Sequence, residues 1–210
     1  MDAKRRRLLA VALAAPFFRI GGANAQQTAL ANGVFLVAKP DLPDPNFRET
    51  VVLITQPDAG SGPLGVIVNR PLAARLSDAL PGIGEVPESS NQIYGGGPVA
   101  RNRVLFLVRS REPAPRSLQV LDDVYLTGDP ELPAKVARGD LKAESYRAYI
   151  GYSGWAQRQL QAEIAAGGWY LAPADADMIF AADAASVWPA MIKRVTTLTT
   201  LLSIDSMIGT

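Results

Sequence analysis

Three short apolar runs restrict the fold of this chain more than any other feature. They occupy residues 34–38, 51–55 and 65–68, and segments dense in Pro, Gly, Asp and Asn separate them. Each run is rich in β-branched residues and too short for an ordinary helix, so each predicts a β-strand. The first part of the chain therefore predicts strands joined by polar loops.

Later segments add both strands and helices. We expect further strands at residues 93–94, 104–108, 118–120, 124–127, 146–150, 169–171 and 178–180. The spacing of apolar residues predicts helices over residues 72–80, 130–138 and 155–166, and a last helix capped by Asp183. Regular βαβ alternation is missing, so we predict one α+β (mixed α/β) domain with a single curved sheet and helices packed on its outside.

The first 25 residues predict a cleavable signal peptide. Residues 4–7 are basic, residues 8–18 are apolar, and Ala23-Asn24-Ala25 gives the small-x-small pattern that precedes cleavage. The apolar run is too short to span a bilayer. Arg5-Arg6-Arg7 also resembles a twin-arginine signal, although Sec signals begin with basic residues too. We expect residues 26–210 to form the folded domain in the periplasm or outside the cell.

The charge of the mature chain does not favour nucleic acid as a partner. The leader holds five of the 21 basic residues and one of the 20 acidic residues, which leaves 16 basic and 19 acidic residues and a charge of about −3. A nucleic-acid-binding domain usually carries a net basic surface instead.

Cysteine and histidine are both missing from the sequence. Disulfides, thiolate or imidazole metal sites, and Ser-His-Asp or Cys-His catalysis are therefore excluded. We expect no metal and no cofactor, and any chemistry must use carboxylates, Lys, Tyr, Ser, Thr or backbone groups.

Polar residues gather at the ends of the first three predicted strands, where loops on a rigid sheet often carry function. Asn69 and Arg70 follow the third strand, and Asp44 and Arg48 lie between the first two. If these strands are neighbours, Asn69 and Arg70 can approach Asp44 or the glycine segment at residues 95–97 and bind a carboxylate or a phosphate. A structural network is the alternative, with Asp44 capping a turn, Asn69 in a left-handed backbone conformation and Arg70 paired at the surface.

Two glycine-containing segments are further candidates. Gly95-Gly96-Gly97-Pro98 can form a nest of backbone N–H groups around an anion, or a tight turn that permits close strand approach. Gly151-Tyr152-Ser153-Gly154-Trp155 lacks the final glycine of a nucleophile elbow, so we expect Ser153 to cap a helix and Trp155 to serve as a core anchor or cleft wall.

The order and spacing of three motifs resemble the YqgE/AlgH family of bacterial proteins. The motifs are Phe35-Leu36-Val37-Ala38-Lys39-Pro40 with Gly65-Val66-Ile67-Val68-Asn69-Arg70-Pro71, then Tyr94-Gly95-Gly96-Gly97-Pro98, then Gly151-Tyr152-Ser153-Gly154-Trp155. The resemblance implies a bent sheet like a partial barrel and a cleft where the motifs converge, and it brings no established catalytic residue. Family members often carry a histidine near the position of Pro57 and lack a leader, so this chain departs from the pattern twice.

We therefore predict a non-catalytic ligand-binding or regulatory protein of the cell envelope, with a small molecule, an anion or a protein as its partner. The candidate ligand-binding residues are Lys39, Asp44, Arg48, Asn69, Arg70, Gly95, Gly96, Gly97, Tyr152 and Trp155. The first alternative is a hydrolase or transferase that uses the Asp44 carboxylate with a nearby basic residue. The second is a transcriptional regulator, which the family name alone suggests and which an exported chain opposes.

The signal-peptide prediction is tested by expressing the full chain and fractionating the cells. We expect the protein in the envelope or the medium, with Gln26 as its first residue by N-terminal sequencing. Replacing Ala25 with a bulky residue should block cleavage, because signal peptidase requires small residues at this place. An uncleaved chain in the cytoplasm would contradict the prediction.

Overall fold

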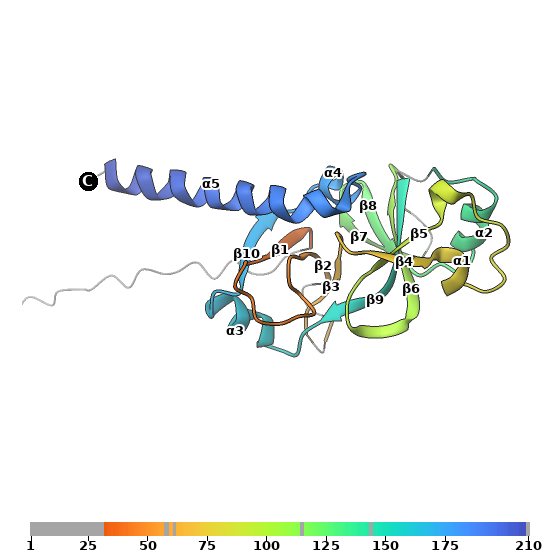
Figure 1. Cartoon of the computed structure of the whole chain (residues 1–210), viewed down its shortest axis with the longest axis horizontal. Coiled ribbons are helices and arrows are strands. Elements are labelled where there is room, and N and C mark those ends of the chain that lie inside the picture. Colours follow the sequence, from red (N-terminus) through yellow and green to blue (C-terminus); the bar gives the residue numbers. More distant parts are fainter. Residues whose placement is uncertain (1–31, 57–58, 61, 114–115, 143–144, 209–210) are drawn as a thin grey trace, which may run out of the picture.

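The three apolar runs form neighbouring strands in the computed structural model, which describes residues 32–56, 59–60, 62–113, 116–142 and 145–208 (Figure 1). They are β1 (Val34–Ala38), β2 (Val51–Gln56) and β3 (Leu64–Ile67), and they pair antiparallel in this order. The predicted leader and Pro57 lie outside the described residues.

The remaining strands extend this group into one bent sheet. They are β4 (Pro71–Arg75), β5 (Gln92–Gly95), β6 (Val99–Arg109), β7 (Ser117–Leu121), β8 (Val124–Thr127), β9 (Tyr146–Gly154) and β10 (Trp169–Pro173). Among the described residues the main order is β10-β1-β2-β3-β9-β6-β8-β7, and β4 and β5 branch off beside β9. The β5–β9 pair is parallel and the other pairs are antiparallel, so the sheet is mixed, and the predicted single α+β domain is confirmed.

Strand β9 changes partner along its length, and this exchange bends the sheet. Residues 148–150 pair with β5, whereas residues 153–154 pair with β3. Gly151 lies between the two stretches with a φ of +69°, a conformation that glycine adopts without strain. A Cβ on Gly96 would lie 2.3 Å from the Gly151 carbonyl oxygen, and one on Gly97 would lie 2.3 Å from the Tyr152 carbonyl carbon. The glycines are therefore required because two backbone segments touch here.

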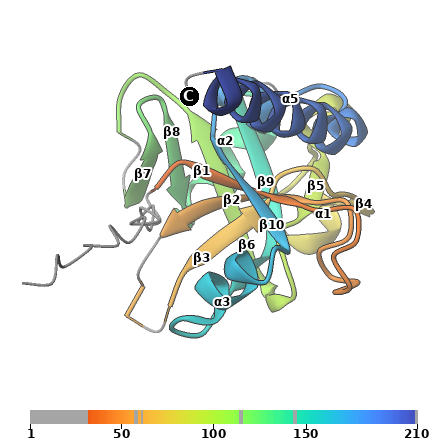
Figure 2. The ribbon, with the colours of Figure 1, turned by 90° about the vertical axis from the view of Figure 1, so that its left-hand side faces the viewer.

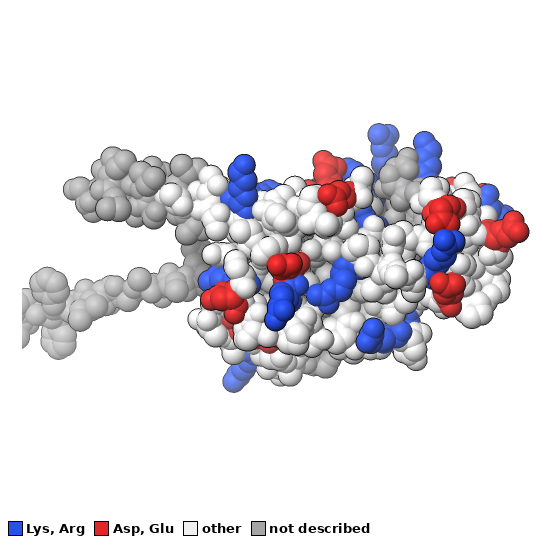
Figure 3. All heavy atoms as spheres, viewed as in Figure 1, with Lys and Arg blue, Asp and Glu red and all other residues white. Residues whose placement is uncertain are grey.

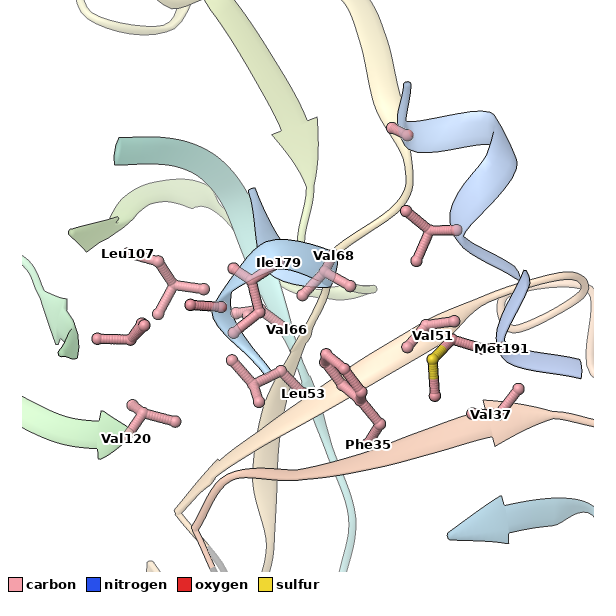
Figure 4. Packing of buried hydrophobic residues seen from close by; sticks show 14 of the residues in the cluster. Phe35, Val37, Val51, Leu53, Val66, Val68, Leu107, Val120, Ile179 and Met191 are labelled. Carbon is pink, nitrogen blue, oxygen red and sulfur yellow. The ribbon is translucent and has the colours of Figure 1, made fainter. Parts of the chain in front are cut away.

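Strands β1 to β3 are covered on both faces, which explains their continuous apolar runs. Alternate residues of β1 and β2 face opposite sides, as the period of a strand requires. Helix α4 (Ala176–Ile179), the short 3-10 helix η3 (Ala184–Ser186) and α5 (Val187–Ile208) pack on one face, and α3 (Gln159–Ala165) packs on the other (Figure 2). Figure 4 shows Ile179 and Met191 from these helices packed against strand residues such as Phe35 and Leu53.

A third cluster fills the opposite end of the molecule. There α1 (Leu76–Ala79), the 3-10 helix η1 (Glu88–Ser90) and α2 (Leu132–Ala137) lie beside β5 and β6 (Figure 1). Leu76, Leu132 and Val136 pack against Ile93 and Phe106. None of the helices in the described part of the chain is long and apolar enough to cross a membrane.

Three local predictions were wrong, and two predicted helices are shorter than expected. The expected helix over residues 72–80 is the strand β4 followed by the single turn of α1, because β4 pairs with β5. The helix expected over residues 155–166 is present as Gln159–Ala165, and the helix expected over residues 130–138 is present as Leu132–Ala137. Residues 178–180 belong to α4 and the residue after it, where Asp175 caps the helix, and are not a strand. Ser153 caps no helix, because it lies within β9.

The last predicted cap is confirmed. The Asp183 side chain accepts a hydrogen bond from the Ala185 N–H at 3.0 Å at the start of the final helical segment. The buried side chains of Val187, Met191 and Val195 join the core, and the Trp188 indole donates to the Ala38 carbonyl at 2.7 Å. These contacts fasten α5 to β1.

The close backbone contact at Gly96 predicts a large loss of stability for Gly96→Ala. The new methyl group would need to displace the Gly151 carbonyl, so we expect a loss of about 3 kcal/mol of unfolding free energy. Gly128→Ala is the matched control, because its Cβ meets nothing nearer than a side-chain carbon at 3.9 Å; we expect a change below about 1 kcal/mol. Urea denaturation measures both, and equal effects would contradict the packing argument.

Candidate functional site

The loop between β1 and β2 is fastened to the residues that follow β3. The Asn69 side chain accepts a hydrogen bond from the Val51 N–H at 2.8 Å and donates one to the Glu49 carbonyl at 3.0 Å. Glu49 has a φ of +54°, so the left-handed residue at this junction is Glu49, whereas Asn69 was the residue expected to adopt that conformation. Asn69 therefore joins two loops through their backbones.

Arg70 lies next to this junction and reaches the same loop. Its Nη1 donates to the Asn46 carbonyl at 2.7 Å, and its Nη2 lies 3.5 Å from the Arg48 carbonyl. The side chain is half-buried, and burial lowers the pKa of the guanidinium from its usual value. No carboxylate lies within ion-pair distance of Arg70 among the described residues. Arg70 thus holds the loop through carbonyl groups, and no carboxylate of the described residues pairs with its charge.

The glycine segment meets Arg70 at the same rim of the sheet. The Gly95 N–H donates to the Arg70 carbonyl at 2.8 Å, and the Gly96 N–H donates to the Ile150 carbonyl at 2.8 Å. The Gly96 carbonyl accepts from the Ile67 N–H at 2.9 Å and from the Ser153 hydroxyl at 3.0 Å. The amides of Gly95 and Gly96 are therefore engaged in the backbone, which agrees with close strand approach better than with an anion nest.

A hollow of about 190 Å³ opens where these segments converge, and we call it the rim hollow. Its lining residues are Asn46, Arg70, Leu72, Gly95, Gly97, Pro98, Arg101 and Ile150. Three of the predicted residues, Arg70, Gly95 and Gly97, line it directly. Three other predicted residues bond to lining residues: the Asp44 side chain accepts a hydrogen bond from the Asn46 N–H at 2.8 Å, the Arg48 carbonyl faces Arg70, and the Gly96 N–H donates to the Ile150 carbonyl. Asn69 precedes Arg70 in the chain, but its side chain bonds to Val51 and Glu49, which lie outside the lining.

Arg101 is the charged residue of this lining that sequence reasoning missed. It is exposed, lies at the start of β6, and has no carboxylate within ion-pair distance among the described residues. Its neighbour Ala100 has a φ of +49°, in an irregular stretch of the pairing between β6 and β9. Backbone strain of this kind is often found at functional sites. The only signal in the sequence was the basic Arg101-Asn102-Arg103 directly after the glycine motif.

Lys39 and Trp155 do not line the rim hollow. The Lys39 ammonium lies 4.7 Å from the centre of the Tyr170 ring, near β10. Trp155 is buried and stacks on Phe47 with 5.6 Å between ring centres. Tyr152 is half-buried and packs against the core, and its backbone, not its ring, lies next to Gly97, so it does not line the hollow either.

Glu163 explains the orientation of Trp155. Its Oε2 accepts hydrogen bonds from the indoles of Trp155 and Trp169, each at 3.0 Å. Its Oε1 accepts from the Gln159 side chain at 3.0 Å. This carboxylate fixes the two tryptophans in the core, as expected of an anchor.

The lining of the rim hollow can bind but offers little for proton transfer. Its polar side chains are one amide and two guanidinium groups, and arginine stays protonated in proteins. In the described part of the chain no three carboxylates gather where they can hold a metal ion. On the face shown in Figure 3, Lys and Arg side chains are interspersed with Asp and Glu, and no continuous basic field covers it.

Comparison with known proteins places the chain among relatives of its own size. A family model described as AlgH-like matches residues 35–199. A UPF0301 protein of Chlorobium luteolum is 35% identical over 165 residues, which cover 78% of this chain and 85% of the relative. A UPF0301 protein of Thermobifida fusca is 34% identical over 175 residues, which cover 77% and 85%.

Two solved structures share the architecture. The solution structure of the AlgH protein from Pseudomonas aeruginosa has a TM-score of 0.60 at 29% identity and covers 71% of this chain and 80% of that chain. The crystal structure of protein DIP2367 from Corynebacterium diphtheriae has a TM-score of 0.63 and covers 79% of this chain and 87% of that chain. Its identity is 22%, so this second likeness supports the fold alone.

The junction at Asn69 gives a prediction about stability. Asn69→Ala removes the acceptor of the buried Val51 N–H, and we expect a loss of about 2 kcal/mol of unfolding free energy. Asn69→Asp keeps an acceptor but loses the donor to the Glu49 carbonyl, so its loss should be smaller. Chemical denaturation measures both variants, and a neutral Asn69→Ala would show that the side chain does not hold the loop.

Proposed function

This chain belongs to the AlgH-like family, and we propose that it is a non-catalytic protein that binds a small anion in the rim hollow. The observation that carries the proposal is the pair Arg70 and Arg101, which border one hollow with no carboxylate partner among the described residues. Guanidinium groups bind carboxylates and phosphates through paired, charge-assisted hydrogen bonds.

The size of the rim hollow supports a small ligand. Pockets for drug-sized molecules usually measure about 300–1,000 Å³. At about 190 Å³ the rim hollow suits an anion such as phosphate, sulfate or a short carboxylate. Carbonyl groups already hold Arg70 in place, so little side-chain entropy remains to be lost when the anion binds.

The composition of the lining supports binding over catalysis. General acid–base catalysis needs a group whose pKa lies near the working pH. The side chains around the rim hollow are Asn, Arg, Leu, Pro and Ile, and none of them titrates there. Asp44, the residue expected to serve a carboxylate enzyme, lies beside the hollow and accepts from the Asn46 N–H.

An anion would also link two loops. Asn46 belongs to the loop before β2, and Arg101 lies at the start of β6. A ligand held by Arg70 and Arg101 would tie these segments together, which gives a binding protein a way to signal occupancy to a partner.

We further propose that residues 1–25 direct this activity to the cell envelope.

The proposal is tested by titrating the purified protein with phosphate, sulfate and acetate at constant ionic strength, followed by NMR. We expect the amide signals of residues around Arg70, Gly97 and Arg101 to shift with at least one anion. Arg101→Gln should weaken that binding about tenfold, because one of two charges is lost.

Arg103→Gln is the matched control, because Arg103 is an exposed arginine on the same strand outside the lining. Its affinity should equal that of the unchanged protein. Equal effects of the two substitutions, or no shifts with any of the three anions, would contradict the proposal.

A further inference from the structure

A second and larger hollow lies at a different place in the fold. It measures about 410 Å³ and is lined by Ser89, Ser90, Gln92, Tyr94, Tyr146, Arg147, Phe180 and Ala182. These residues come from η1, β5, β9 and the segment between α4 and η3. The volume falls within the usual range for small-molecule sites. No residue lines both this hollow and the rim hollow.

Arg147 is the unusual residue of this hollow. Only 8% of it is exposed, yet no carboxylate lies within ion-pair distance among the described residues. Its Nη2 donates to the Ala181 carbonyl, and its Nε is buried without a hydrogen-bond partner. The guanidinium carbon lies 4.4 Å from the centre of the Tyr94 ring. The Ala181 carbonyl and the Tyr94 ring thus contact this buried positive charge, and the Tyr149 hydroxyl interacts with it electrostatically.

A buried guanidinium charge without a carboxylate partner lowers the stability of the folded protein. Burial lowers the pKa of the Arg147 guanidinium from its usual value, because desolvation disfavours the charged form. A second polar group nearby is also unpaired, since the Tyr149 hydroxyl is buried two residues along the same strand face without a hydrogen-bond partner. An apolar residue at position 147 would avoid the cost of the buried charge, so packing alone does not account for the arginine.

The rest of the lining complements a charged ligand with an organic body. The rings of Tyr94 and Phe180 provide apolar surface, and Ser89, Ser90 and Gln92 provide polar groups on the side of η1 and β5. Tyr146 is fixed by its hydroxyl, which donates to the Ser90 carbonyl. A pocket that combines apolar walls, a few polar groups and one charge is typical of a site for a small metabolite.

We propose that this hollow binds a small organic anion, a carboxylate or phosphate ester carrying an apolar or aromatic group, whose negative charge pairs with Arg147. The Arg147 charge then gains the counter-charge that the described residues do not supply. The ligand body lies against Tyr94 and Phe180, and its remaining polar atoms meet Ser89, Ser90 or Gln92. This site is separate from the proposed anion site in the rim hollow, and either can fail without the other.

The test uses benzoate and phenyl phosphate as probes, with benzyl alcohol as the neutral control. Titration of the purified protein should shift the NMR signal of the Arg147 Nε–H with at least one of the two anions and not with the alcohol. Arg147→Met should weaken binding about tenfold or more, and its melting temperature without ligand should equal or exceed that of the unchanged protein.

Two further variants make the outcome decisive. Arg147→Lys keeps the positive charge but loses the planar guanidinium group. This variant should still fold, and it should bind the two anions more weakly than the unchanged protein. Arg103→Gln lies outside the lining of both hollows, so it should leave the response of the Arg147 signal to the organic anions unchanged. If neither anion shifts the Arg147 signal, or if Arg147→Met binds as well as the unchanged protein, the proposal is overturned. If Arg147→Met fails to fold, the titration of the unchanged protein decides alone.

Discussion

The contact between the backbones of residues 96–97 and 151–152 is the constraint on which the rest of the structure depends. At this place β9 leaves β5 and joins β3, and no side chain fits between the two segments. The Gly96 carbonyl binds the Ile67 N–H and the Ser153 hydroxyl together, so three strands meet at one residue. The bend that makes the sheet resemble a partial barrel follows from this contact.

The same contact creates the rim hollow. Gly95 leads out of β5 with its N–H on the Arg70 carbonyl, and Gly97 leads into the strained start of β6 that carries Arg101. Arg70 in turn holds the loop before β2 through the Asn46 carbonyl. Two guanidinium groups thus face one space because rigid backbone segments place them there. Binding sites built on such segments need little rearrangement to receive a ligand.

The sequence predicts the sheet better than the helices. Residues 34–38 and 51–55 are apolar throughout because both sides of the sheet are covered, and short β-branched runs are a direct strand signal. Residues 72–80 have helical spacing, but pairing with β5 outweighs that local preference. The convergence of Asn69, Arg70 and the glycine motif was predicted from strand ends. Arg101 and Arg147 were missed, because each matters only through neighbours that lie far away in the sequence.

The account rests on Arg70 and Arg101 sharing one anion above the glycine contact. A crystal structure of the protein grown with selenate tests this most directly, because anomalous scattering from selenium locates the anion without ambiguity. We predict a selenate within hydrogen-bond distance of both guanidinium groups, with the loop before β2 still held by Arg70. Selenate bound only elsewhere, beside an empty rim hollow, would contradict the account.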